Sequence, residues 1–180
     1  MMTQSGWQSQ ILTDSFGQAQ LRVHAQCRKL QDDVQFQFRW SDPAKEMRTL
    51  EVGAQRPLSR ADLIWQGTCA EVFWGEVGSE SYFELNANHL RQWNIYRFTN
   101  YRQPQPPQAS AVFHVQEIQI IDTEISIVVR GPWQKSSWEL GFASVVVTPD
   151  QKLLYFSESK APGKPDFHWR GLRTLKLQKD

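Results

Sequence analysis

The chain has 180 residues, of which 40% are hydrophobic and 12% aromatic, including eight tryptophans. This length and composition predict one globular domain over residues 1–180 and exclude a disordered chain. The net charge is +1, with 20 basic and 19 acidic residues, so bulk charge indicates neither a nucleic-acid partner nor a membrane partner.

The first twelve residues, MMTQSGWQSQIL, contain neither the basic segment nor the apolar run of a secretory signal. No stretch is apolar over the length needed for a helix to cross a bilayer. We therefore expect a cytoplasmic location. In that compartment Cys27 and Cys69 are expected to be reduced core residues and not a disulfide.

Strict alternation of apolar and polar residues marks the first predicted strands. Apolar side chains occupy every second position of residues 21–28 and again of residues 34–40. This period of two is typical of strands that bury one face. Asp32 and Asp33 supply a turn between them, and residues 49–52 are predicted as a third strand.

The later strands are separated by turn and loop residues. Proline-rich residues 101–110 and residues 161–167 are predicted as loops, because proline lacks the N–H that an interior strand needs. The remaining predicted strands are residues 69–75, 81–88, 92–98, 113–121, 124–131, 136–148, 153–159 and 170–177. About ten short strands with almost no helix predict an all-β fold, a single-domain antiparallel β-sandwich of two packed sheets.

Catalytic and metal-binding motifs are missing from the sequence. It contains no C-x-x-C, no H-E-x-x-H and no glycine-rich phosphate loop. The four histidines are far apart and lack the spacing of metal ligands. Cys69 lies in an apolar run with no evident base to activate it. The sequence therefore predicts no enzyme, no metal site and no cofactor.

Aromatic and polar residues gather in several of the predicted elements. Trp65 and Glu71 lie six residues apart, and Tyr82, Glu84 and Asn86 share the polar face of one strand. An aromatic ring can cover the apolar face of a sugar while carboxylates and amides bind its hydroxyls. The pattern therefore indicates a carbohydrate ligand, with core packing of the tryptophans as the alternative.

Residues 62–75, DLIWQGTCAEVFWG, hold one acid in an apolar run. On an ideal strand Cys69, Glu71 and Phe73 share one face. Glu71 is then either a paired structural carboxylate or the polar floor of a small concave site. Glu71 and Glu84 together would suit glycoside hydrolysis, but no other feature of the sequence supports that reaction.

Four blocks, LIWQGTCAEVFWG, SYFELNAN, QWNIYRFTNYR and KPDFHWRG, follow one another in the chain. In this order they resemble the DOMON-like proteins related to family 9 carbohydrate-binding modules. Ala70 departs from the pattern, because the family often has phenylalanine there. The matching positions are Leu63, residues 65–73, Tyr82, Glu84, Asn86, Trp93, Tyr96, Phe98, Tyr101, Arg102 and residues 164–168.

The resemblance implies a β-sandwich and a non-catalytic binding domain for a sugar or a similar small polar ligand. The related modules hold a sugar between two tryptophans, with an acid and an arginine nearby. Trp65 and Glu71 match the first tryptophan and the acid, while Trp169 and Arg97 are candidates for the other two. Further candidates, for ligand binding or structure, are Tyr82, Glu84, Asn86, Trp93, Tyr96, Arg102, Asp166 and His168.

Two other functions stay open at this point. One is a structural or protein-interaction domain without a small-molecule site, in which Glu71, Tyr96 and Arg102 form buried polar pairs. The other is haem binding, which wider DOMON relatives achieve with a methionine and a histidine or lysine. In this sequence Met47 would have to act with His114 or His168.

Overall fold

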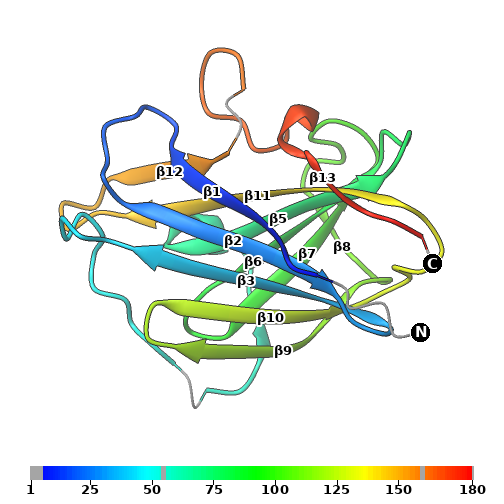
Figure 1. Ribbon diagram of the computed structural model, residues 1–180, viewed down its shortest axis with the longest axis horizontal. Coiled ribbons are helices and arrows are strands. Elements are labelled where there is room, and N and C mark those ends of the chain that lie inside the picture. Colours follow the sequence, from blue (N-terminus) through cyan, green and yellow to red (C-terminus); the bar gives the residue numbers. More distant parts are fainter. Residues whose placement is uncertain (1–5, 54–55, 159–160, 180) are drawn as a thin grey trace.

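The computed structural model describes residues 6–53, 56–158 and 161–179, and its thirteen strands belong to one hydrogen-bonded sheet (Figure 1). Within these residues helical structure is limited to two 3-10 turns, η1 (Ile64–Gln66) and η2 (Arg170–Leu172). The all-β prediction is therefore confirmed. The strands are β1 (Gln8–Asp14), β2 (Arg22–Lys29), β3 (Asp33–Ser41), β4 (Ser59–Arg60), β5 (Cys69–Glu76), β6 (Tyr82–Ala87), β7 (Gln92–Phe98), β8 (Gln108–Ala109), β9 (His114–Ile121), β10 (Glu124–Arg130), β11 (Trp138–Val147), β12 (Leu153–Ser157) and β13 (Leu175–Leu177).

The sheet is continuous because strand β1 has two neighbours. Residues 8–12 pair with β2, whereas Thr13 and Asp14 pair with β12. The strand order is β4-β7-β6-β5-β11-β12-β1-β2-β3-β10-β9, with β8 beside β7 and β13 beside β11. Two separate sheets were expected, and the structure instead joins its two halves through β1. One pair, β4 with β7, is parallel.

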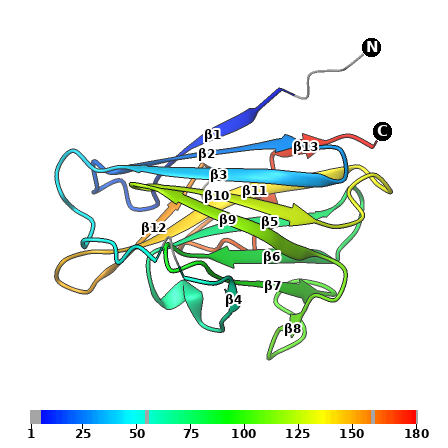
Figure 2. The same cartoon turned by 90° about the horizontal axis from the view of Figure 1, so that it is seen from below.

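The main core lies between the two halves of the curled sheet. Figure 2 shows β2 and β3 along one side of the molecule and β6 and β7 along the other. Phe38 of β3 meets Phe142 of β11 at a ring separation of 5.4 Å, and Phe36 lies 6.3 Å from Trp74 of β5. Fully burying a side chain of this size stabilises the fold by roughly 1.5–3 kcal/mol.

A smaller apolar cluster occupies the other face of β5, β6 and β7. Tyr82 stacks on Phe98 with ring centroids 4.8 Å apart. Trp65 and Phe167 pack on this cluster from the loops. Because successive side chains of a strand point to opposite faces, Trp74 enters the main core while Phe73 enters this cluster. Strands β5 to β7 are consequently buried on both faces.

Several expectations about strands were wrong. Of residues 170–177, predicted as one strand, residues 170–172 form η2 and only Leu175–Leu177 form β13, while β8 (Gln108–Ala109) lies in the segment predicted as a proline-rich loop. Residues 49–52 form no strand, and three of these four residues are exposed. Strand β1 was not foreseen, because polar Gln10 and Asp14 occupy two of its three buried positions. Asp14 accepts hydrogen bonds from the backbone N–H groups of residues 16, 18 and 19. Within the described residues no helix has the length and apolar character to span a membrane.

Candidate functional site

A pocket of about 320 Å³ opens on the face of β5, β6 and β7 that carries the smaller apolar cluster. Its floor comes from these strands, and its rim comes from residues 65–66, 102–107 and 165–168. Its lining residues are Trp65, Gln66, Glu71, Phe73, Glu84, Tyr96, Phe98, Arg102, Gln105, Pro107, Val145, Leu153, Tyr155, Pro165, Phe167 and His168.

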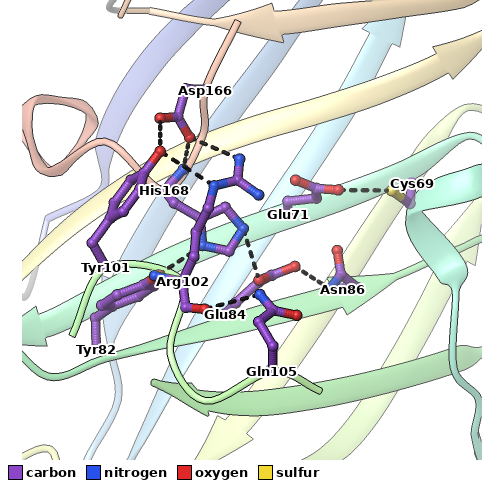
Figure 3. A network of polar contacts seen from close by, with 10 residues as sticks. All are labelled: Cys69, Glu71, Tyr82, Glu84, Asn86, Tyr101, Arg102, Gln105, Asp166 and His168. Carbon is purple, nitrogen blue, oxygen red and sulfur yellow. Dashed lines mark hydrogen bonds and ion pairs between the residues drawn. The ribbon is translucent and has the colours of Figure 1, made fainter. Parts of the chain in front are cut away.

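Two carboxylates, Glu71 of β5 and Glu84 of β6, stand on the floor of this pocket. Glu71 pairs with Asn86 across the two strands and Glu84 pairs with Phe73, so the two acids are diagonal neighbours. Their exposed fractions are only 3% and 7%. Figure 3 shows both carboxylates extending from their strands into the same space.

Burial controls the protonation of these acids. Burial and, to a smaller extent, the charge of Glu84 together raise the pKa of Glu71 to about 8, against a hydrogen bond from Cys69 that lowers it. Burial also raises the pKa of Glu84 to about 7, opposed by a hydrogen bond from Asn86 and by the charge of Arg102. Near neutral pH the two acids together therefore retain on the order of one proton.

A second set of polar contacts joins the loops at the rim of the pocket. The Arg102 guanidinium lies 2.9 Å from Asp166 Oδ1, and the Tyr101 hydroxyl donates to Asp166 Oδ2 at 2.5 Å (Figure 3). Burial alone would raise the pKa of Asp166, but the hydrogen bonds from Tyr101 and Arg102 outweigh it and lower this pKa. These contacts tie the loop after β7 to the loop before η2.

His168 connects the rim to the floor. The Arg102 backbone N–H donates to the Tyr82 hydroxyl at 3.1 Å, and this hydroxyl lies 2.7 Å from His168 Nδ1. When the Tyr82 hydroxyl donates to Nδ1, the ring proton of His168 is on Nε2, which lies 3.6 Å from Glu84 Oε2. Burial and the charge of Arg102 lower the pKa of His168 to about 4. The contact with Glu84 is therefore not an ion pair at neutral pH.

Trp65 forms one aromatic wall. It lies in η1, directly before the chain enters β5, and meets Tyr96 edge-on at 5.8 Å. The Tyr96 hydroxyl donates to Asp62 at 2.6 Å, which fixes the position of the tyrosine ring. Tyr155 and Phe167, with ring centroids 6.0 Å apart, form another wall.

The structure brings nine of the twelve candidate residues to this region. Six line the pocket: Trp65, Glu71, Glu84, Tyr96, Arg102 and His168. Three hold the lining residues from outside it: Tyr82, Asn86 and Asp166. Their roles in ligand binding stay predictions.

The other three candidates lie elsewhere. Trp93 is buried in the main core, and Arg97, which shares its strand face, is exposed at the end of β7. The Trp169 ring folds over Gly171, where an added Cβ would lie 2.3 Å from it. Trp169 is not among the residues that line the pocket with Trp65, and its role in ligand binding stays a prediction. Phe167 and Tyr155 supply the rings that line the pocket with Trp65.

Several lining residues were not singled out from the sequence. Phe73 and Phe98 lie two positions beyond Glu71 and Tyr96, so strand alternation could have found them. Phe167 lies within the fourth family block, whereas Gln105 and Tyr155 reach the pocket through the folding of a loop and of β12, for which the sequence holds no local signal.

The candidate haem ligands have different surroundings. Met47 packs against the main core, whereas His168 contacts Phe73 and Phe98 on the opposite face of the sheet. His114 lies against the Trp93 ring at 4.9 Å. No group of three or more metal-ligating residues occurs in the described part of the chain. Both cysteines are free and buried, and burial raises the pKa of the Cys69 thiol.

Neither a protein-family model nor a curated protein matches the chain. In structure it is similar to a protein of Bacteroides uniformis ATCC 8492 described as a "putative carbohydrate-binding protein". The identity is 10%, the TM-score is 0.65, and the match covers 98% of this chain and 87% of that chain.

A family 9 carbohydrate-binding module of Caldicellulosiruptor kristjanssonii in complex with cellotriose is 12% identical, over 88% of this chain and 75% of that one. Its TM-score of 0.47 is too low to establish a common fold. The chain thus shares an all-β fold with the Bacteroides protein.

Proposed function

We propose that the chain is a non-catalytic domain that binds a sugar or a similar small polar ligand in this pocket. The observation that carries the proposal is the composition of the pocket. Two buried carboxylates, Glu71 and Glu84, stand in a pocket to which Trp, Tyr and Phe contribute six of the sixteen lining residues. Such a combination of apolar walls with a few directed polar groups is characteristic of small-molecule sites.

The geometry suits a small ring-shaped ligand. The side chains of Trp65 and Tyr96 can cover its apolar face. Glu71 Oε2 has no hydrogen bond from any described residue, so it is available to accept one from a ligand hydroxyl. Arg102, already held by Asp166, can donate from the rim without losing much side-chain freedom.

Two likenesses support this function. The fold is similar to that of the Bacteroides protein, whose description names carbohydrate binding. The four sequence blocks resemble DOMON-like proteins related to family 9 modules, and Trp65, Glu71, Glu84, Tyr96, Arg102 and His168, all of which line the pocket, lie within those blocks. We propose that the chain is related to these DOMON-like proteins, and this proposal rests on the four sequence blocks.

The absence of catalysis is part of the proposal. The Cys69 thiol is fully buried and its pKa is raised, so it is a poor nucleophile. Its hydrogen-bond acceptor, Glu71, also has a raised pKa and does not stabilise a thiolate. A buried thiol of this kind suits a structural role.

Titration of tryptophan fluorescence with monosaccharides and oligosaccharides tests the function. A saturable change at millimolar concentration is expected, and the Trp65→Ala variant should lose it. Trp7→Phe is the matched control, because Trp7 is exposed and stacks on Arg28 in β2, away from the pocket. No response to any sugar, or the same response in Trp65→Ala, would show that the pocket is not a sugar site.

A further inference from the structure

Among the residues that the structure describes, no arginine or lysine forms an ion pair with the carboxylates on the pocket floor, although the charge of Arg102 acts on Glu84 from the rim. Within residues 6–53, 56–158 and 161–179, Glu71 has one hydrogen bond, from Cys69 Sγ at 3.5 Å. Glu84 accepts from Asn86 at 2.7 Å, and its other oxygen faces the neutral ring of His168. An ionised carboxylate buried without a cation is costly, so a positively charged ligand group would stabilise the ionised form of this pair.

The cations nearest to this pair already have other contacts. Arg102 is bound to Asp166, and the Arg173 guanidinium lies over the Tyr82 ring at 5.2 Å. Once both glutamates are ionised, the acids of this region outnumber its cations. The titratable and charged groups around the pair are Asp62, Cys69, Tyr82, Tyr96, Arg102, Tyr155, Asp166, His168 and Arg173.

Aromatic rings surround the same space. Trp65 and Tyr96 lie on one side, Tyr155 and Phe167 on another, and Phe73 and Phe98 beside the acids on the floor. The faces of aromatic rings attract cations, and this attraction strengthens where water is excluded. Both the aromatic rings and the carboxylates therefore favour a cationic ligand group.

We propose that the ligand of this pocket carries an ammonium group, held by Glu71 and Glu84 and enclosed by the surrounding rings. The inference rests on the proposed function and narrows its ligand class to amino sugars or alkylammonium compounds. A cation offsets the burial of the two carboxylates, whereas a neutral sugar hydroxyl only forms hydrogen bonds with them.

Binding of such a cation is linked to proton release. Because burial raises the pKa of Glu71 to about 8 and that of Glu84 to about 7, the empty pair holds on the order of one proton at pH 7. An ammonium ion favours the ionised pair and lowers both pKa values. Affinity for a permanent cation should therefore rise about tenfold per pH unit, which is about a hundredfold between pH 6 and pH 8. A neutral ligand should not show this increase.

Isothermal titration calorimetry of the full chain tests this inference with two matched pairs of compounds. The first pair is choline and its neutral isostere 3,3-dimethyl-1-butanol, and the second is D-glucosamine and D-glucose. At least one cation should bind about tenfold or more tightly than its neutral counterpart at pH 7. The pair that responds identifies an alkylammonium compound or an amino sugar as the ligand class. Choline titrations at pH 6 and pH 8 measure the change in affinity, and buffers of different ionisation enthalpy measure proton release.

The variant that tests the residues is Glu71→Gln combined with Glu84→Gln. It should lose both the preference for cations and the proton release. Glu76→Gln is the matched control, because Glu76 is the exposed last residue of β5. Its cation preference should equal that of the unsubstituted protein.

The outcomes separate this inference from the proposed function. Equal affinity within both pairs, or a cation preference that persists in the double variant, overturns the ammonium inference while the binding function stands. Absence of binding by all four compounds and by the wider sugar panel overturns both. Proton release from the unsubstituted protein is measured independently of how well the double variant folds.

Discussion

Replacing Glu71 by glutamine should stabilise the empty protein at alkaline pH. Burial raises the folded-state pKa of Glu71 from 4.5 to about 8, so the folded protein binds this proton more tightly than the unfolded chain does. The stability that this tighter proton binding contributes is fully present below about pH 4.5 and is lost as the pH rises through 8. At pH 9 the pKa difference lowers the free energy of unfolding by at most about 5 kcal/mol, because each unit of pKa difference corresponds to about 1.4 kcal/mol.

Urea unfolding of both proteins at pH 4, 6, 8 and 9 measures this effect. At pH 4 the two free energies of unfolding should be similar, because glutamine resembles the protonated acid in size. The advantage of the variant should then grow with pH. Glu76→Gln, at the exposed end of β5, should show no such trend.

The opposite result is what a paired structural carboxylate predicts. Breaking a buried ion pair destabilises a protein by about 3–5 kcal/mol. If Glu71→Gln is less stable than the unsubstituted protein at pH 9, Glu71 has a buried cationic partner. The conclusion that Glu71 has no compensating cation in the empty pocket would then be incorrect.

Three further substitutions test the packing and the polar network. Phe142→Ala should reduce the free energy of unfolding in urea by about 3–5 kcal/mol, because Phe142 is fully buried between the two halves of the sheet. Gly141→Ala should lower the thermal midpoint and cost about 1–3 kcal/mol, since the new Cβ would lie 2.3 Å from the backbone oxygen of Leu172; an unchanged midpoint would contradict this close approach. Tyr82→Phe removes the hydroxyl that lies 2.7 Å from His168 Nδ1 and should cost about 1 kcal/mol. Nitrogen NMR shifts of the His168 ring should move in that variant, and unmoved shifts would exclude the assigned tautomer.

The strands could be predicted largely because their side chains alternate. Residues 92–98 were predicted as a strand and are β7 (Gln92–Phe98), and residues 124–131 differ from β10 (Glu124–Arg130) by one residue. Alternation failed where polar residues face inward, as Gln10 and Asp14 do in β1. Two separate sheets were expected from the number of short strands alone, and the link through β1 could not be seen because β1 itself was missed.

The site was predictable only in part. Family blocks and alternation indicated Trp65, Glu71 and Glu84, which all line the pocket. They did not locate the loops, and the position of Trp169 depends on how its loop turns at η2. A residue on a loop is placed by long-range contacts, such as that between Arg102 and Asp166, which a single sequence does not reveal.

The central claim is that a small polar ligand binds on the outer face of β5, β6 and β7. Chemical-shift mapping of the nitrogen-15-labelled protein with the sugar and amine panel tests it most directly. Saturable shifts are expected in residues 65–73, 84–107 and 165–168, around the lining of the pocket. Shifts confined to β2, β3, β9 and β10, or no shifts with any compound, would contradict it.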